Sequence, residues 1–177
     1  MGTEEGHRSL ESTPLTIRWE ELWEIARHGQ EVYPAECCGI LVGSKGKGKE
    51  VIRIYRARNL CQDRPRDRYE IDPLEYWRVD QEIRAQGPSG LEIIGFYHSH
   101  PDHLPEPSAW DLEYAWPAHS YLILSLNAGE VDQFRSWQLD EREGRFQEEP
   151  LRISGRSAIP ESPTPSFPFP GRSAVRW

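Results

Sequence analysis

The stretch LEIIGFYHSH, residues 91–100, is the part of the chain that says most about the fold. It is rich in β-branched and aromatic residues and follows a GPSG break at residues 87–90, so it predicts a β-strand. Residues two apart in a strand point to the same face. His98 and His100 therefore present both imidazoles in one direction at the end of this strand, while Ser99 points away. Two imidazoles placed in this way have the geometry of a bidentate metal site.

A serine and an aspartate follow the two histidines after a proline-rich loop. Ser108 and Asp111 form a Ser-x-x-Asp pair, which is also a capping-box variant, so simple helix capping is the alternative explanation. Together with His98 and His100, Asp111 would complete three ligands and leave a fourth position for water, as in catalytic zinc sites. Such a site makes hydroxide available near pH 7. Ser108, beside the ligand, suits the stabilisation of a tetrahedral oxyanion.

A hydrolytic site of this kind also needs a group that transfers protons. Glu36 lies in YPAECCGILVG, at the entry of a short apolar run that predicts a buried strand over residues 37–43. An ionisable group has little structural reason to be there. Glu36 is thus the candidate proton shuttle, although taken alone it would be an ordinary loop residue.

Helices and strands alternate around these motifs. Apolar residues at i, i+3, i+4 and i+7 from Trp19 predict an amphipathic helix that ends near Gly29, with Thr16 as its cap. Asp72 is the expected N-cap of a second helix, with Glu75 completing a capping box, that runs to about Gln86. Further strands are expected over residues 51–57 and 120–126 and near 131–139 and 145–153. The expected class is α/β (α+β mixed), with one mixed sheet flanked by helices.

Size and composition limit the possible functions. The 177 residues fit one domain, and the formal net charge of −8 disfavours a nucleic-acid partner. No apolar run reaches the length of a membrane span and the polar opening lacks a signal-peptide core, so the expected location is cytoplasmic, without membrane association. Three cysteines, two of them adjacent, predict no disulfide framework. The expected divisions are a flexible leader (1–14), a catalytic domain (15–153) and a flexible tail (154–177) rich in proline and serine.

The functional positions together resemble one family. Glu36 followed by Cys38-Gly39, then His98-x-His100, seven residues, Ser108, two residues and Asp111 resembles the JAMM (MPN+) zinc metallopeptidase signature at all five functional positions. The segments GFYHSHP, PSAWDLEYA, RYEIDP and SYLILSL extend the resemblance to the compact bacterial branch, over about residues 15–153. The resemblance implies a JAMM/MPN fold, related to that of cytidine deaminases. It also implies zinc held by His98, His100 and Asp111, a proton relay at Glu36 and oxyanion stabilisation by Ser108.

The same resemblance implies a substrate class. It points to a peptidase or isopeptidase that cuts after the C-terminal Gly-Gly of a small ubiquitin-like sulfur-carrier protein. A zinc dipeptidase or small-amide hydrolase and a non-catalytic scaffold that binds ubiquitin-like proteins are the alternatives. A scaffold would be expected to lack ligand positions that this sequence keeps, and a zinc deaminase would need a P-C-x-x-C pair that is absent. The oligomeric state is left open.

Other polar residues near these motifs have simpler explanations. His103 could be a further metal ligand or a substrate contact, but a solvated loop histidine is favoured, and His28 is expected at the surface. The basic run RPRDR (64–68) could receive an acidic carrier protein, yet a solvated face is the preferred interpretation. Trp110 and Trp116 are assigned to packing, with the lining of a substrate groove as the alternative.

Overall fold

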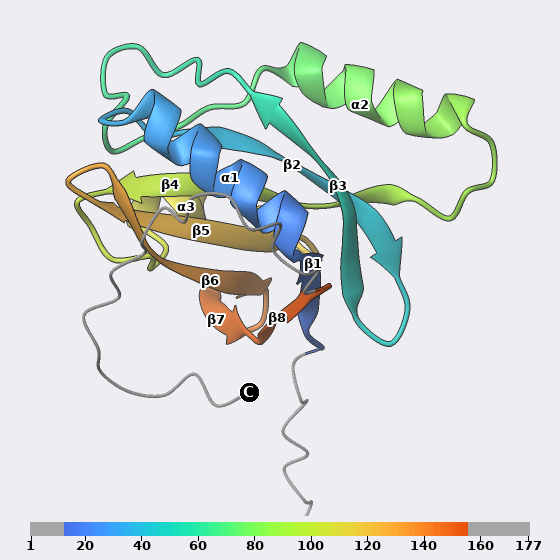
Figure 1. The fold of residues 1–177 in the computed structure, drawn as a ribbon. Coiled ribbons are helices and arrows are strands. Elements are labelled where there is room, and N and C mark those ends of the chain that lie inside the picture. Colours follow the sequence, from blue (N-terminus) through green and yellow to red (C-terminus); the bar gives the residue numbers. More distant parts are fainter. Residues whose placement is uncertain (1–12, 156–177) are drawn as a thin grey trace, which may run out of the picture.

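The computed structural model describes residues 13–155, so most of the expected leader and tail lies outside the described residues. Its centre is an eight-stranded sheet with the order β7-β6-β5-β4-β2-β3-β1-β8 (Figure 1). Strands β1 and β3, β1 and β8, and β4 and β5 pair in parallel, whereas the other neighbours are antiparallel. The predicted mixed sheet with flanking helices is therefore confirmed. The elements are β1 (Leu15–Arg18), α1 (Trp19–Val32), β2 (Cys38–Lys45), β3 (Lys49–Ala57), α2 (Pro73–Ala85), β4 (Glu92–Pro101), α3 (Ala109–Glu113), β5 (Ser120–Asn127), β6 (Glu130–Asp140), β7 (Arg145–Glu149) and β8 (Leu151–Ser154).

The two longer helices cover opposite faces of the sheet. Helix α1 buries Leu22 and Ile25 in a cluster with one set of strand side chains, which includes Leu41 and Tyr97. On the other face, α2 contributes Val79 and Ile83 to a second cluster, with Ile40, Val42, Ile93, Phe96 and Tyr121. Since both faces of the central strands are covered, β2, β4 and β5 are buried over most of their length, instead of alternating between buried and exposed residues.

The two edges of the sheet are joined by a single residue. The expected strand over residues 145–153 is in fact two strands, β7 and β8, separated by Pro150, and they pair with β6 and β1 at opposite ends of the strand order. Proline cannot donate a backbone hydrogen bond, which accounts for the break. The Pro150 carbonyl accepts from the Leu15 amide at 2.9 Å. The sheet must therefore curl so that its first and last strands in this order approach each other.

A buried polar network lies beside this junction. Lys49 donates to the Ser120 hydroxyl at 2.9 Å, and its Nζ is 3.9 Å from a carboxylate oxygen of Glu149. Glu149 is 1% exposed, and the Ser136 hydroxyl donates to it at 2.7 Å. Buried charges require such partners, so these contacts fix the relative positions of strands β3, β5, β6 and β7.

The first helix differs from its prediction at both ends. Strand β1 precedes it without a break, and Thr16 lies inside that strand instead of acting as the cap. Arg18 is the N-cap and makes no capping hydrogen bond through its side chain, and the helix continues past Gly29 to Val32. A short strand of four residues gave no periodic signal of its own, which is why the sequence did not reveal β1.

The second helix begins as predicted but is capped by one side chain only. Asp72 accepts from the Leu74 amide at 2.9 Å, and Pro73 occupies the first helical position. Glu75 does not close a capping box, because its carboxylate instead accepts from the Arg58 amide at 3.1 Å. No described helix is long and apolar enough to cross a membrane.

His28, expected at the surface, is one of the buried residues of α1. It is 7% exposed, and its Nδ1 lies 2.9 Å from the Tyr97 hydroxyl. Burial, and then the charge of Arg56, lower the pKa of His28 to about 4. His28 follows the buried Ile25 by three residues and so lies on the same face of α1, a position that the stripe starting at Trp19 did not include.

The low pKa of His28 predicts part of the acid sensitivity of the fold. The unfolded chain binds a proton at this residue below about pH 6.5, whereas the folded chain does not until about pH 4. The contribution of His28 to stability is thus complete above pH 6.5, and about 2 kcal/mol of this contribution is lost as the pH falls towards 4. In metal-free protein, His28→Gln should reduce the difference in urea stability between pH 7 and pH 4.5. The exposed His103, replaced by Gln, is the control; an unchanged difference in His28→Gln would contradict the expectation.

Candidate metal and catalytic site

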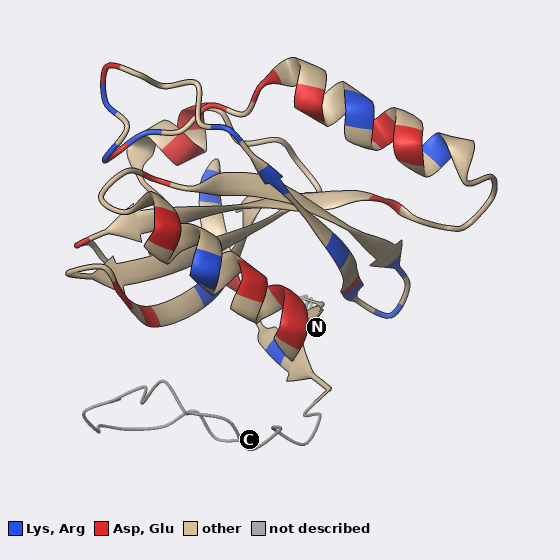
Figure 2. Ribbon diagram, turned by 45° about the horizontal axis from the view of Figure 1, so that its top comes forward, with Lys and Arg blue, Asp and Glu red and all other residues tan. Residues whose placement is uncertain are grey.

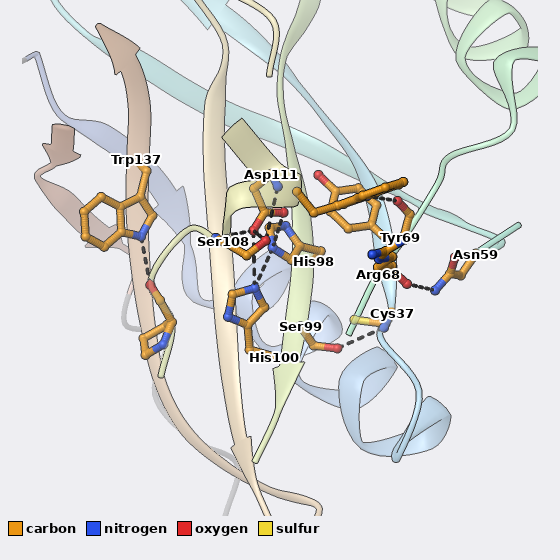
Figure 3. Close-up of polar contacts among 12 residues, drawn as sticks. Cys37, Asn59, Arg68, Tyr69, His98, Ser99, His100, Ser108, Asp111 and Trp137 are labelled. Atoms are coloured by element: carbon orange, nitrogen blue, oxygen red, sulfur yellow. Dashed lines mark hydrogen bonds and ion pairs between the residues drawn. The ribbon is translucent and has the colours of Figure 1, made fainter. Parts of the chain in front are cut away.

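Three potential metal ligands converge at the C-terminal end of β4. His98 and His100 project from this strand, and Asp111 projects from the short helix α3 (Figure 3). One ligand atom from each of the three lies within 4.8 Å of the other two. The expected pairing of alternate strand residues is therefore observed, and Ser99 on the opposite face accepts from the Cys37 amide at 2.9 Å.

The ligand atoms face one another at short range. His98 Nε2 lies 3.0 Å from His100 Nε2 and 3.2 Å from Asp111 Oδ1. His100 Nε2 lies 3.7 Å from Asp111 Oδ2. All three side chains are buried, with exposed fractions of at most 8%. Burying two imidazoles and a carboxylate so close together is costly unless they share a proton or a cation.

Contacts behind the ligands orient both rings. His100 Nδ1 lies 2.8 Å from the Leu104 carbonyl oxygen, and because a carbonyl only accepts, Nδ1 carries the hydrogen. A neutral His100 therefore has the lone pair of Nε2 directed at the site. Tyr69 stacks on His98 with ring centroids 4.4 Å apart. Burial lowers the pKa of His98, which favours the neutral ring that can bind a metal ion.

Ser108 and Asp111 form the capping box of α3 as well as part of the site. The Ser108 hydroxyl accepts from the Asp111 amide at 3.2 Å, and the Ser108 amide donates to Asp111 Oδ2 at 2.6 Å. The hydroxyl also donates to Oδ2 at 2.6 Å. Burial opposes ionisation of Asp111, but His98, His100 and Ser108 outweigh it and hold the pKa of this carboxyl below its usual range. Helix capping and the contribution of a ligand are therefore compatible roles for Asp111.

The donor set fits a zinc ion. Two neutral imidazoles and one ionised carboxylate are the ligand types of catalytic zinc sites with an open fourth position. His98 Nδ1 is buried without a hydrogen-bond partner in residues 13–155, so only the Nε2 edge of this ring takes part in the polar cluster. The Nε2 atoms of both histidines and the Asp111 carboxylate meet at one point, as coordination of a single ion requires.

Glu36 and Ser108 line one cavity with His100. The cavity has a volume of about 350 Å³ and is also lined by Arg66, Asp67, His103, Leu104 and Glu106. Glu36 is 4% exposed and lies just before β2, where its amide donates to the Pro65 carbonyl. Burial, and then the charges of Asp111 and Asp67, raise the pKa of Glu36 to about 9. A strongly perturbed carboxyl in a cleft beside potential metal ligands is typical of catalytic sites.

Several residues around this cavity were not singled out by the sequence. Tyr69 and the Leu104 carbonyl orient the histidines, and Arg66 and Asp67, within the run 64–68 interpreted as a solvated face, line the cavity. The connection between β3 and α2 folds back on the site, which only the three-dimensional structure reveals. Its place is fixed by Asn59, whose side-chain amide donates to the Glu36 and Arg68 carbonyls at 3.2 and 2.9 Å.

The remaining candidates near the site have packing contacts. Trp110 lies under the Arg68 guanidinium, 4.3 Å from ring centroid to Cζ, and its indole donates to the Tyr69 carbonyl. Trp116 packs edge-on against Tyr76 and Phe96, as the packing interpretation expects. His103 lines the cavity, but it is absent from the group of three converging ligands.

The chain is similar to known proteins in both sequence and fold. Residues 20–140 match the family described as prokaryotic homologs of the JAB domain. A desampylase of Haloferax volcanii is 41% identical over 121 residues, which are 66% of this chain and 84% of that protein. A CysO-cysteine peptidase of Mycobacterium tuberculosis is 26% identical over 140 residues, 78% of this chain and 90% of its own. The solution structure of a Desulfitobacterium hafniense protein, 29% identical, superposes with a TM-score of 0.68 over 79% of this chain and 92% of that one.

Proposed function

Because this chain belongs to the family of prokaryotic homologs of the JAB domain, we propose that it is a zinc-dependent metallopeptidase of the JAMM type. Its substrate, in this proposal, is a small ubiquitin-like sulfur-carrier protein, cut after the C-terminal Gly-Gly. The observation that carries the proposal is the convergence of His98, His100 and Asp111 next to the cavity lined by Glu36 and Ser108. A cytoplasmic location, expected from the sequence, stays a prediction.

His98, His100 and Asp111 are the proposed zinc ligands. Bound there, zinc would supply a water of lowered pKa and polarise the scissile carbonyl. The chain itself prepares the ligands: the Leu104 carbonyl selects the tautomer of His100, and the capping box of α3 holds the Asp111 carboxylate towards the two rings. The ligand geometry is therefore set by one strand, one short helix and the loop between them.

Glu36 is the proposed proton carrier. Hydrolysis adds the hydroxyl of water to the glycine carbonyl carbon and breaks the C–N bond, so one proton must move from water to the leaving amine. Glu36 lines the cavity beside His100 and has a carboxyl group whose raised pKa makes it an effective proton donor. In its ionised form, which the positive charge of a bound zinc ion would favour, Glu36 would accept the proton of the attacking water and, once protonated, give it to the amine.

Ser108 is the proposed oxyanion donor. Its hydroxyl lines the same cavity, and its backbone position is fixed by the capping box. In the structure the Ser108 hydroxyl donates to Asp111 Oδ2. The hydroxyl therefore has to rotate towards the substrate when the tetrahedral oxyanion forms. A hydroxyl can rotate without moving the helix, and this makes the change small.

The relatives support the substrate class. The names of two of them, desampylase and CysO-cysteine peptidase, describe enzymes that cleave a protein conjugate or a peptide bond to cysteine. The match with the desampylase covers 84% of that protein, so the resemblance extends over most of its length. The proposal includes the substrate class, and the experiment below identifies which carrier protein this chain cleaves.

The test is intact-mass analysis of candidate sulfur carriers, each extended beyond Gly-Gly by one or more residues. Each carrier is incubated with zinc-loaded protein or with the Asp111→Ala variant. Loss of the extension only with the unaltered site is the expected result. No cleavage of any carrier by zinc-loaded protein would contradict the proposed substrate, and would favour the alternative of a small-amide hydrolase.

A further inference from the structure

Arg66 lines the cavity, and no residue within 13–155 accepts a hydrogen bond from its guanidinium. Its side chain is 67% exposed, and its closest charged partner is Asp102, with Nη2 and Oδ2 4.0 Å apart. Within residues 13–155 the guanidinium makes no hydrogen bond, whereas Asp102 is already held by the Tyr33 hydroxyl and the Ala128 amide, at 2.9 and 2.8 Å. The five N–H donors of Arg66 are therefore available to a ligand.

Of the three acidic residues that line the cavity, Asp67 and Glu106 are engaged elsewhere. Asp67 binds Arg64 within the same loop, and Glu106 is 3.1 Å from Arg135. In Figure 2 the connection between β3 and α2 carries both basic and acidic segments. Since Asp67 and Glu106 already have cationic partners, an anion that enters the cavity meets in Arg66 a cation whose guanidinium is free to bind it.

The backbone places Arg66 on the same side of the cavity as Glu36. The Glu36 amide donates to the carbonyl of Pro65, the residue directly before Arg66. Both side chains line the cavity. In the proposed function, Glu36 gives a proton to the amine of the leaving residue. The α-carboxylate of a single amino acid is attached to the same carbon as this amine, so it would lie near Glu36 as well.

We propose that Arg66 binds the free α-carboxylate of the residue that follows Gly-Gly, and thereby makes the enzyme prefer carriers extended by one amino acid. This inference rests on the proposed function. A guanidinium binds a carboxylate through two parallel hydrogen bonds, which lysine cannot reproduce. A longer extension has an amide at this position, which lacks the negative charge.

The experiment compares two substrates of equal length. One carrier ends in Gly-Gly-Ala with a free carboxylate, and the other ends in Gly-Gly-Ala with a carboxamide, so the two differ only in the charge next to the scissile bond. Cleavage by zinc-loaded full-length protein is followed by intact mass. The wild-type protein should cleave the free acid with a kcat/KM roughly tenfold to hundredfold higher than the amide.

The Arg66→Met variant should lose this preference, because its kcat/KM should fall much more on the free acid than on the amide. Arg66→Lys should restore part of it, because the charge returns without the planar pair of donors. Arg58→Met is the matched control: Arg58 lies in the same connection, is 70% exposed and has a similarly distant partner, Asp72, at 3.7 Å, but it does not line the cavity. It should behave as the wild-type protein.

The outcomes distinguish a failure of the proposed role of Arg66 from a failure of the proposed peptidase activity. Equal cleavage of acid and amide by the wild-type protein, or an equal loss on both in Arg66→Met, would overturn the role of Arg66 and leave the proposed peptidase intact. Failure of the wild-type protein to cleave either substrate would overturn the proposed function and this inference with it. Retained activity of Arg66→Met on the amide also shows that the variant is folded.

Discussion

Glu36→Gln is expected to lower kcat by at least about 100-fold while zinc remains bound, because the amide keeps the size of the carboxyl and cannot carry a proton. Glu36 lies outside the group of three converging ligands, so its replacement leaves the ligand set complete. Turnover is measured with a cleavable carrier, and bound zinc by elemental analysis of the purified variant. Loss of zinc in Glu36→Gln would identify Glu36 as a ligand and contradict the proposed proton transfer.

The same variant should be more stable than the wild-type protein when both are metal-free. With a folded pKa of about 9 against an ordinary value of 4.5, Glu36 stays protonated in the folded chain at pH 7 but ionises on unfolding. Its contribution to stability is complete below pH 4.5 and declines as the pH rises to about 9. Replacement by Gln removes this loss, and about 2 kcal/mol of added stability at pH 7 is expected.

Urea unfolding of the metal-free proteins at pH 7 and pH 4.5 checks this expectation. The gain in Glu36→Gln should be present at pH 7 and nearly absent at pH 4.5. Glu113→Gln, at an exposed position of α3, is the control and should change neither stability nor turnover. A variant that loses activity without gaining stability at pH 7 would show that Glu36 is better solvated than its burial implies.

Asp111→Asn is expected to weaken zinc binding by more than about 100-fold, since loss of a ligand should exceed the 10- to 100-fold cost of losing a group that only orients one. The asparagine oxygen can still accept from the Ser108 amide, which the Asp111 carboxylate does now. The capping box would therefore survive while the negative charge of the site is lost. Affinity is measured by competition with a chromogenic chelator.

Asp111→Ala separates the two roles of this residue. It should lose zinc to the same degree and, in addition, about 1 kcal/mol of stability without metal, because the Ser108 amide and hydroxyl lose the carboxylate that accepts from them. The Ser108 hydroxyl can still accept from the backbone amide of residue 111. Similar metal-free stability of the Asn and Ala variants would mean that capping by Asp111 contributes little. Zinc affinity unchanged in Asp111→Asn would contradict the assignment of Asp111 as a ligand.

The sequence predicted those parts of the molecule that depend on short spacings. His98 and His100 share a face because alternate strand residues do, and Ser108 caps α3 because a serine three residues before an acidic residue is a local signal. Glu36, more than 60 residues earlier in the chain, was a candidate from its place before a buried strand, and the resemblance to the JAMM family linked it to the other positions. The fold class and the family are confirmed, whereas the roles of these residues stay predictions.

The features that the sequence did not reveal depend on contacts between distant segments. Tyr69 and Arg66 reach the site because the irregular connection after β3 folds over it, and irregular backbone has no period to detect. His28 turns inwards to meet Tyr97, a partner 69 residues away. The division of the last strand at Pro150 follows from the closure of the sheet, although the proline itself marked a place where a continuous ladder could not run.

The pairing of β1 with β8 has a consequence for how the domain folds. These are the first and last strands of the described chain, and they are neighbours in register from Leu15 with Leu151 to Arg18 with Ser154. On the ribosome, β1 emerges early but must wait for nearly the whole domain before its outer edge is covered. Topologies dominated by contacts between distant segments fold slowly. We therefore expect refolding on the millisecond-to-second scale typical of such topologies, with completion of the sheet edge among its last events.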